Sequence, residues 1–231
     1  MKKAVCLISG GIDSCVTTYI AKSKGYEIYA ISFNYGQRHK KEIECTKKIA
    51  ELVKAKKHVI FNINLDKFGG SSLVNKKLKP EINRKIDEIG EKIPSTYVPA
   101  RNTVFLSIAL AYAETIDAEA IFIGVTATDY SGYPDCRPEY IKAFQKMVNL
   151  ATKKCIEGNS IKIKAPLLNL SKAEIIKKGK KLGVPFDKTW SCYLGKKLAC
   201  GRCDSCILRL KGFKEAGLKD MIKYKDFPNH I

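Results

Sequence analysis

The segment Ser9-Gly10-Gly11-Ile12-Asp13-Ser14 is a glycine turn that follows an apolar run and precedes an amphipathic one. Its glycines allow a tight bend, and free N–H groups at a helix start, together with the Ser9 and Ser14 hydroxyls, can bind phosphate. The segment has neither the Gly-Lys-Ser/Thr of a Walker loop nor the Gly-x-Gly-x-x-Gly of a dinucleotide site. It is therefore a phosphate loop of another kind or a strand-to-helix turn capped by serine.

Four cysteines near the carboxyl end are spaced for metal binding. Cys192, Cys200, Cys203 and Cys206 form the pattern Cys-x7-Cys-x2-Cys-x2-Cys, in which two overlapping short steps bring the sulfurs together. Four cysteine ligands close the shell of a tetrahedral Zn²⁺, which indicates a structural ion with no open position for substrate. The spacing alone also permits an iron–sulfur cluster. We interpret the other cysteines as small buried residues, except Cys136, which lies among polar residues.

The stretch 129–137 has side chains that could hold a planar, anionic substrate. Its tyrosines can stack on a flat ring, and Asp129 and Asp135 can accept hydrogen bonds from a guanine-like N–H pair. Arg137 can pair with a carboxylate. The stretch follows a predicted strand, and loops at the carboxyl ends of parallel strands line ligand crevices. A surface turn is the alternative interpretation.

Two further polar stretches have a similar mixture of side chains. Arg101, which precedes an apolar run, can pair with phosphate or carboxylate or point into solvent, and Asn102 is predicted to cap the following helix. Residues 33–39 end a predicted strand and combine aromatic, amide and basic groups. His39 among them is more typical of a solvated helix start than of a catalytic base.

Short apolar runs alternate with amphipathic stretches along most of the chain. Periodicity predicts strands at 4–8, 27–33, 58–63, 120–125 and 161–164, and helices at 15–24, 38–54, 102–115, 138–152 and 171–182. This alternation over short connections favours right-handed crossovers and a parallel sheet. Ser171 and Glu174 have capping-box spacing at the start of the last helix. Residues 66–99 lack a period and are predicted to be a long loop with local helix, which is usually functional or mobile.

The composition limits the classes of protein to which the chain can belong. The chain has 231 residues, 45% of them hydrophobic, which allows a sizeable core and excludes wholesale disorder. A formal net charge of +19 indicates a polyanionic partner, such as nucleic acid or nucleotide phosphates. No apolar stretch is long enough to span a membrane, and no signal peptide is recognisable. We therefore expect a cytoplasmic protein, in which clustered cysteines more often hold metal than form disulfides.

Taken together, these segments resemble the 7-cyano-7-deazaguanine synthase (QueC) family, within the N-type ATP pyrophosphatases of the PP-loop superfamily. The matching segments run in the family's order at 9–14, 35–39, 98–102, 131–137, 171–172, 189–192 and 200–206. The resemblance implies an α/β fold with a Rossmann-like parallel sheet, similar to the adenine nucleotide alpha hydrolases. It further implies a PP-loop ATP pyrophosphatase and substrate domain over residues 1–185 and a small zinc-binding helical lobe over residues 186–231.

The activity that the resemblance implies is that of a carbon–nitrogen ligase. Such an enzyme converts 7-carboxy-7-deazaguanine and ammonia to 7-cyano-7-deazaguanine through adenylated intermediates and an amide, with release of AMP and diphosphate. The product is a precursor of queuosine or archaeosine. The resemblance implies small-molecule partners without nucleic acid or membrane, and it is compatible with a homodimer.

The resemblance also implies roles for individual residues. The ATP-binding residues would be Ser9, Gly10, Gly11, Asp13 and Ser14. Asp13 would reach the Mg²⁺ that accompanies ATP, and Arg101 and Lys172 would neutralise phosphate charge, which makes these three the catalytic residues. The substrate-binding residues would be Tyr35, Gln37, Arg38, Gly132, Tyr133, Asp135 and Arg137. Asp135 would face the amino–imino edge and Arg137 the carboxylate. A structural Zn²⁺ would be held by Cys192, Cys200, Cys203 and Cys206.

Two other functions compete with this one. A tRNA-modifying enzyme on the same scaffold, a thiolase or a lysidine-type ligase, would suit the positive charge. However, no dedicated RNA-binding domain is visible, and a closed four-cysteine site offers no accessible thiol for sulfur transfer. A zinc-ribbon nucleic-acid-binding protein without catalysis would leave residues 9–14 and 129–137 without a function.

Overall fold

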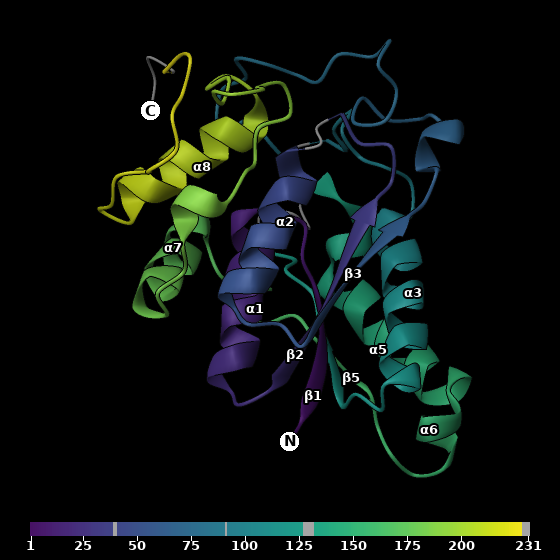
Figure 1. The fold of residues 1–231 in the computed structure, drawn as a ribbon. Coiled ribbons are helices and arrows are strands. Elements are labelled where there is room, and N and C mark those ends of the chain that lie inside the picture. The colour runs from purple at the N-terminus through teal and green to yellow at the C-terminus, as the bar shows by residue number, and fades with distance from the viewer. Residues whose placement is uncertain (39–40, 91, 127–131, 228–231) are drawn as a thin grey trace.

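The computed structural model describes residues 1–38, 41–90, 92–126 and 132–227. Its centre is a five-stranded sheet in the order β3-β2-β1-β4-β5, with every neighbouring pair parallel (Figure 1). The strands are β1 (Lys3–Leu7), β2 (Glu27–Asn34), β3 (Lys57–Asn62), β4 (Ala120–Phe122) and β5 (Lys162–Lys164). The predicted α/β class with a parallel sheet is therefore confirmed.

The order of the strands creates a switch point beside β1. The chain moves outward from β1 through β2 to β3 and then returns to add β4 on the other side of β1. The loops that follow β1 and β4 consequently leave the sheet in opposite directions. A crevice opens between such loops at the carboxyl ends of the strands, and ligands of open α/β sheets bind there.

Helices cover both faces of the sheet (Figure 1). One face is covered by α1 (Ile12–Ser23), α2 (Lys41–Leu52) and α7 (Lys172–Lys181), and α8 (Asp204–Glu215) packs on α7. The other face is covered by α3 (Arg101–Thr115) and α5 (Pro138–Ala151), and the short α6 (Lys153–Ile156) follows α5. Three short 3-10 turns lie among the described residues: η1 (Leu65–Lys67), η2 (Pro134–Cys136) and η3 (Phe186–Lys188).

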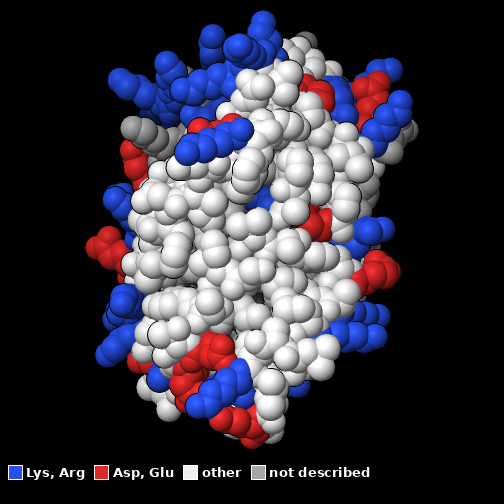
Figure 2. All heavy atoms as spheres, turned by 90° about the vertical axis from the view of Figure 1, so that its right-hand side faces the viewer, with Lys and Arg blue, Asp and Glu red and all other residues white. Residues whose placement is uncertain are grey.

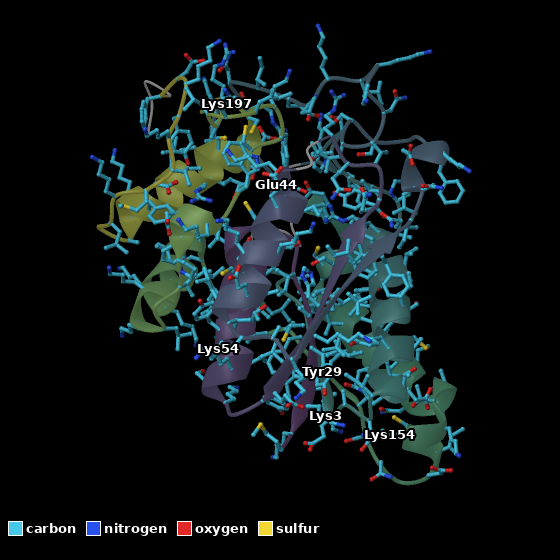
Figure 3. The ribbon with its side chains drawn as sticks, in the orientation of Figure 1. Lys3, Tyr29, Glu44, Lys54, Lys154 and Lys197 are labelled. Atoms are coloured by element: carbon cyan, nitrogen blue, oxygen red, sulfur yellow. The ribbon has the colours of Figure 1, made fainter. Side chains whose placement is uncertain are left out.

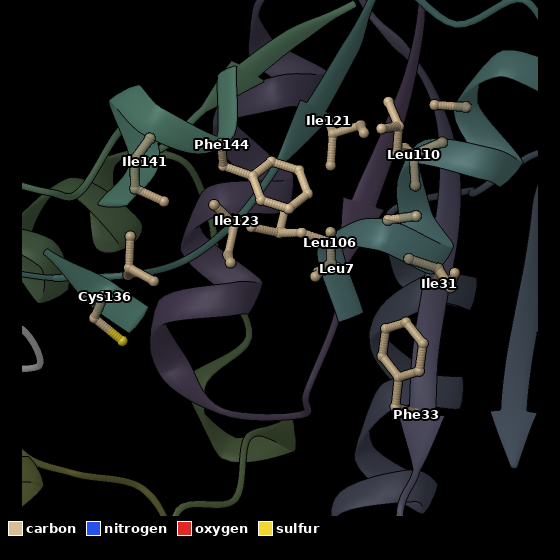
Figure 4. Close-up of a cluster of buried hydrophobic side chains, with 14 of the residues drawn as sticks. Leu7, Ile31, Phe33, Leu106, Leu110, Ile121, Ile123, Cys136, Ile141 and Phe144 are labelled. Atoms are coloured by element: carbon tan, nitrogen blue, oxygen red, sulfur yellow. The ribbon is translucent and has the colours of Figure 1, made fainter. Parts of the chain in front are cut away.

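The core has two halves because successive strand residues point to opposite faces. Ala4 and Cys6 of β1 pack toward α1 and α7, whereas Val5 and Leu7 pack toward α3 and α5. Figure 4 shows the second half, in which Leu7 lies among side chains from α3 and α5. A strand that is buried on both faces must be apolar throughout, which explains the continuous apolar run at the start of the chain.

The structure corrects one prediction at the start of α3. Asn102 does not cap this helix, because Ala100 is the N-cap residue, in a left-handed conformation with φ 51°, and Asn102 lies within the first turn. The Asn102 N–H instead donates to Oδ2 of Asp135 at 2.8 Å. A carboxylate distant in the chain thus accepts at this helix start, which local sequence does not reveal. The capping box of Ser171 and Glu174 at the start of α7 is confirmed.

The segment after β3 is a long loop with local helix, as predicted, and it reaches the cysteine-rich region. Ile82 forms an antiparallel bridge with Cys203, and the Asn83 N–H donates to the Arg202 carbonyl at 2.8 Å. Arg84 forms an ion pair with Asp204 at the start of α8. The loop is therefore fixed across the carboxyl edge of the sheet.

The carboxyl-terminal region shares its packing with the sheet domain. Phe213 of α8 lies against Phe186, with ring centroids 5.3 Å apart, and it belongs to the same buried cluster as α1 and α7. A domain boundary between residues 185 and 186 stays a prediction. Within the described ranges, no helix has the length and apolar character that crossing a lipid bilayer requires.

Candidate active site

A cavity of about 290 Å³ lies at the switch point of the sheet. It gathers many of the residues that the sequence singles out: Ser9, Gly11, Asp13, Ser14, Tyr35, Gln37, Arg101, Gly132, Tyr133 and Lys172. These side chains come from the loops after β1 and β2, from the starts of α1, α3 and α7, and from the loop before η2. The topology thus brings segments far apart in the chain to one hollow.

The glycine turn after β1 is tightly enclosed. Gly10 has φ 85°, and a Cβ there would stand 2.6 Å from the Glu42 carbonyl oxygen, so any larger residue is excluded. Gly11 is the N-cap residue of α1, with no side-chain cap. The Ser9 and Ser14 hydroxyls lie 3.1 Å apart. The N-terminal N–H groups of α1 and these hydroxyls form a site suited to an anion.

Gly124, which follows β4, makes this arrangement possible and was missed by sequence reasoning. A Cβ on Gly124 would lie 2.8 Å from the Ser14 nitrogen and 2.9 Å from the Asp13 carbonyl carbon. The backbone after β4 therefore packs directly on the first turn of α1. A glycine two residues after an apolar strand is the only sequence signal for this contact.

Asp13 and Lys172 form an ion pair inside the cavity. The Lys172 ammonium lies 2.7 Å from each carboxylate oxygen of Asp13, and the two side chains are 17% and 24% exposed. Asp13 lies in the first turn of α1, and Lys172 begins α7. The pair holds one anionic and one cationic group next to the glycine turn.

Arg101 adds a second positive charge to the cavity. Its guanidinium carbon lies 5.9 Å from the centroid of the Tyr35 ring. Burial opposes its charged form, but Tyr35, Tyr133 and nearby anionic groups raise the pKa of Arg101, which stays charged. Burial raises the pKa of Tyr35 to about 12, against the opposing effect of Arg101, so this phenol stays protonated. A fixed guanidinium of this kind pairs well with phosphate or carboxylate.

Four predicted site residues do not line the cavity. Arg38 donates to the backbone carbonyls of Ser72, Asn75 and Leu78, which joins it to the long loop. The remaining three are Gly10, Asp135 and Arg137. Asp135, in η2, is buried against the start of α3, where it accepts from the Asn102 N–H. The Arg137 guanidinium donates to the Pro134 carbonyl. Their roles toward substrate stay predictions. Residues 39 and 129–131, which include His39 and Asp129, lie outside the described residues.

Other residues of the cavity wall were not identified from sequence. Arg84 and Asp204 come from the long loop and from α8, and nothing local marks them as neighbours. Tyr193 contributes an aromatic ring. Glu42, in the first turn of α2, is a further carboxylate in the wall, and burial raises its pKa to about 7 against the opposing charge of Arg101.

The four predicted metal ligands converge. The sulfur atoms of Cys192, Cys200, Cys203 and Cys206 all lie within 4.8 Å of one another, and the four residues are buried. The sulfurs of Cys200 and Cys206 are 3.9 Å apart. Tetrahedral Zn²⁺ with bonds of about 2.3 Å would separate its sulfurs by roughly 3.8 Å, so the cluster fits such an ion. The Gly195 N–H donates to the Cys192 sulfur at 2.9 Å, a contact that favours a thiolate.

Two of the other cysteines, Cys6 and Cys15, are less suited to chemistry. Burial raises the pKa of Cys6, which is fully buried in β1, and raises that of Cys15 to about 12. Thiols with such values are poor nucleophiles at neutral pH. Their interpretation as core residues agrees with their places in the cluster around α1.

Comparison with known proteins relates nearly the whole chain to one family. The family model "Queuosine biosynthesis protein QueC" matches residues 3–217. The 7-cyano-7-deazaguanine synthase of Clostridium kluyveri is 56% identical over 227 residues, which cover 97% of this chain and 99% of that protein. The enzyme of the same name from Picrophilus torridus is 54% identical and covers 99% of this chain and 94% of its own length.

Solved structures of low identity agree on the fold. The NMN synthetase of Francisella tularensis superposes with a TM-score of 0.50 at 17% identity, over 94% of this chain and 78% of that one. A predicted subunit of a tRNA methyltransferase from Methanocaldococcus jannaschii gives the same score and identity, over 100% of this chain and 95% of that one. These likenesses concern the arrangement of the sheet and helices alone.

Proposed function

Because the chain belongs to the QueC family of queuosine biosynthesis proteins, we propose that it makes 7-cyano-7-deazaguanine from 7-carboxy-7-deazaguanine, ammonia and ATP. The observation that carries this proposal is the high identity to synthases of that name over nearly the full length of both chains. The tRNA-modifying alternative is not favoured, since these relatives are synthases. The enzyme is an ATP-using ligase that forms carbon–nitrogen bonds.

The chemistry needs two rounds of activation. A carboxylate does not accept ammonia, because hydroxide or oxide is a poor leaving group. Transfer of AMP from ATP to the carboxylate oxygen expels diphosphate, and ammonia then displaces AMP to give the amide. A second adenylation, on the amide oxygen, allows loss of AMP and two protons to leave the nitrile. One ATP site serves both rounds.

The glycine turn is proposed to bind the diphosphate of ATP. The N-terminal N–H groups of α1 and the hydroxyls of Ser9 and Ser14 face the cavity side of this turn and favour negative charge. Gly10 and Gly11 let the backbone approach the phosphates closely. Asp13 supplies a carboxylate of the kind that Mg²⁺ prefers, and one carboxylate together with phosphate oxygens suffices to hold this ion. Mg²⁺ would neutralise charge on the leaving diphosphate.

Arg101 and Lys172 are proposed to stabilise charge in the transition state. Both line the cavity, and each lies at the start of a helix that is fixed in the core. Fixed cations that face the transferring phosphate lower the barrier because they need not reorganise during the reaction. No side chain is required as a covalent nucleophile, since the substrate provides the attacking oxygen.

The remaining cavity wall is proposed to bind the deazapurine. Tyr35 and Tyr133 offer aromatic surface, and Gln37 and Gly132 lie near them in the wall. We retain Arg38, Asp135 and Arg137 as substrate-binding candidates, with the contacts described above as their present partners. A flat ring between tyrosines and a carboxylate near a guanidinium are the interactions that this set can supply.

We propose that the cysteine cluster holds a structural Zn²⁺. The four thiol groups would complete its shell, so the ion would supply no open position for chemistry. All nine cysteines are free of disulfides in the structure, which suits a reducing compartment, and we expect the enzyme to act in the cytoplasm on small molecules without nucleic acid.

One reaction tests the proposed function. The protein is incubated with ATP, Mg²⁺, ammonium and 7-carboxy-7-deazaguanine, and AMP and the nitrile are measured by mass spectrometry. Formation of both products only when all reactants are present supports the proposal. AMP release that requires transfer RNA would contradict it and would favour the alternative enzyme.

A further inference from the structure

Three described carboxylates line the cavity, and two of them have a cationic partner. Asp13 is paired with Lys172, and Asp204 is paired with Arg84. Glu42 differs from both, because no lysine or arginine among the described residues forms an ion pair with it. A carboxylate that stays unpaired in a partly buried cavity is costly unless a ligand compensates it.

Glu42 also occupies a significant position. It lies in the first turn of α2, and its carbonyl oxygen approaches Gly10 so closely that a Cβ there would be 2.6 Å away. It is therefore packed against the turn proposed to bind diphosphate. The charge of Glu42 acts on Tyr35, and the charge of Arg101 acts on Glu42. The backbone of Glu42 thus packs against the proposed ATP site, and its side chain lines the same cavity within electrostatic reach of Tyr35 and Arg101.

The proposed reactants differ in charge. ATP and 7-carboxy-7-deazaguanine are anions, whereas ammonia exists mainly as the ammonium cation at neutral pH. A cavity that contains Arg101 and Lys172 attracts the anions and repels this cation. Ammonium therefore needs a local negative charge in order to bind beside the two anionic substrates.

We propose that Glu42 binds the ammonium ion that supplies the nitrogen of the product, an inference that rests on the proposed function. The carboxylate accepts hydrogen bonds from the ammonium N–H groups and takes up one proton. The ammonia that remains attacks the adenylated carbon with its lone pair, and AMP leaves with the electrons of the carbon–oxygen bond. Because Glu42 lines the same cavity as the proposed ATP site, the bound nitrogen shares one enclosed space with the carbon that is adenylated. Such proximity makes the attack of nitrogen on carbon a reaction between two bound groups, which is faster than a collision with free ammonia from solution.

The substitution Glu42→Gln separates ammonium binding from the other steps. It keeps the size of the side chain and removes its charge. We expect the KM for ammonium to rise by about 10- to 100-fold, the loss that follows removal of a charge-assisted hydrogen bond. The KM values for ATP and for the deazapurine, and the substrate-dependent exchange of diphosphate into ATP, should stay within about twofold, since these steps precede nitrogen transfer.

A neutral nucleophile provides an independent measurement. Hydroxylamine is mostly uncharged at the assay pH, so the Glu42→Gln variant should use it with a KM within about threefold of the wild-type value. A loss that is equal for ammonium and hydroxylamine would overturn the proposal. So would an unchanged KM for ammonium, or a KM that rises for ATP or the deazapurine instead.

Two further variants control for structure. Glu44→Gln alters an exposed carboxylate on the same helix, labelled in Figure 3, and should leave every KM unchanged. Glu42→Asp keeps the charge on a shorter chain, so its KM for ammonium should lie between wild type and Glu42→Gln, and a value above that of Glu42→Gln would contradict the proposal. A wild-type protein without substrate-dependent exchange would instead refute the proposed function itself.

Discussion

The Lys172 ammonium lies 2.7 Å from both carboxylate oxygens of Asp13, so one ion pair joins the first turn of α7 to the first turn of α1. The two residues are 159 positions apart in the chain, and both line the cavity. In this arrangement the lysine neutralises the aspartate. Binding of Mg²⁺ to Asp13 would release Lys172 toward the phosphates, so the pair keeps both charges at the proposed ATP site.

Replacement of Asp13 tests the ATP site. We expect Asp13→Asn to lower the rate of AMP formation by roughly 10²-fold or more, because it removes the proposed Mg²⁺ ligand and leaves Lys172 without its partner. Metal content of the cysteine cluster should be unchanged. The matched control is Asp187→Asn, which alters a 44%-exposed aspartate in η3. AMP formation by Asp13→Asn at the wild-type rate would exclude Asp13 from catalysis.

Removal of the metal tests the cysteine cluster. We expect one zinc per chain by elemental analysis, and chelation or Cys203→Ser should lower Tm by about 10 °C, since metal binding contributes to folding. Cys155→Ser, which alters a half-buried cysteine outside the cluster, should keep its zinc and lose little stability. Visible absorption from iron, or a metal-free protein of unchanged Tm and full activity, would contradict a structural zinc.

The raised pKa of Glu42 predicts a pH dependence of stability. Burial raises this pKa from 4.5 to about 7, so the folded protein holds the proton more tightly than the unfolded chain does. Below about pH 4.5, Glu42 is protonated in both states and does not lower the free energy of unfolding of the wild type. As the pH rises to about 7, the unfolded chain loses this proton first, so the wild type loses stability. The glutamine of Glu42→Gln has no proton to lose. The free energy of unfolding of this variant should therefore exceed that of the wild type by a margin that grows over this range to on the order of 3 kcal/mol.

Denaturant unfolding at pH values from about 5.5 to 8.5 measures this difference. Groups that do not interact with Glu42 contribute equally to both proteins, so their contributions cancel in the difference. A difference that is constant with pH would show that the carboxyl titrates normally in the folded protein.

The face formed by α3 and α5 predicts a dimer. Figure 2 shows that charged side chains are scarce at the centre of this face, whereas Lys and Arg crowd its upper edge. Helix α3 has no charged residue between Arg101 and Glu114, and Leu150 at the end of α5 is 80% exposed. Two chains of charge +19 repel each other, so an uncharged face is the surface on which they can meet.

Ala111→Lys places a charge at an exposed position of this face. We expect the wild type to sediment as a homodimer and the variant as a monomer. The matched control is Glu119→Lys, beyond the end of α3, where the Glu119 N–H donates to the Lys3 carbonyl. Lys3 is labelled in Figure 3, and the control variant should keep the mass of the wild type. A wild type that sediments as a monomer would contradict the prediction.

Local pattern was sufficient for much of the fold. The strands follow from short apolar runs, and α7 begins where its capping box predicts. The cysteine cluster follows from spacing, because short steps between ligands leave few other geometries. The sheet order β3-β2-β1-β4-β5 is less accessible, since it depends on which edge of β1 the returning chain occupies.

Contacts between residues that are far apart in the sequence could not be predicted from it. Asp135 accepts from the Asn102 N–H, although a local cap on Asn102 was expected. The packing of Gly124 on Ser14, and of Glu42 on Gly10, depends on how separate loops meet at the edge of the sheet. Each of these contacts needs the tertiary structure, because no periodicity links the residues involved.

The buried ion pair of Arg209 and Asp220 leads to a final prediction about stability. Arg209 is 1% exposed and Asp220 3%, with 2.6 Å between Nε and Oδ2, and the guanidinium also donates to Thr189 Oγ1 and the Phe186 carbonyl. Arg209→Met leaves Asp220 buried without its cation, which costs about 3–5 kcal/mol. The double variant with Asp220→Leu should recover part of this loss, because it removes the stranded charge as well.

An exposed pair of the same type provides the control. Arg202 and Asp226 lie 3.1 Å apart with side chains 46% and 40% exposed. Because solvent screens such a pair, Arg202→Met should cost no more than about 1 kcal/mol. Denaturant unfolding of the three variants compares the two pairs in one protein. Equal losses of unfolding free energy for Arg209→Met and Arg202→Met would show that burial does not determine how much an ion pair contributes to stability. Arg209 would then not be the residue that fixes α8 to the segment before the cysteines.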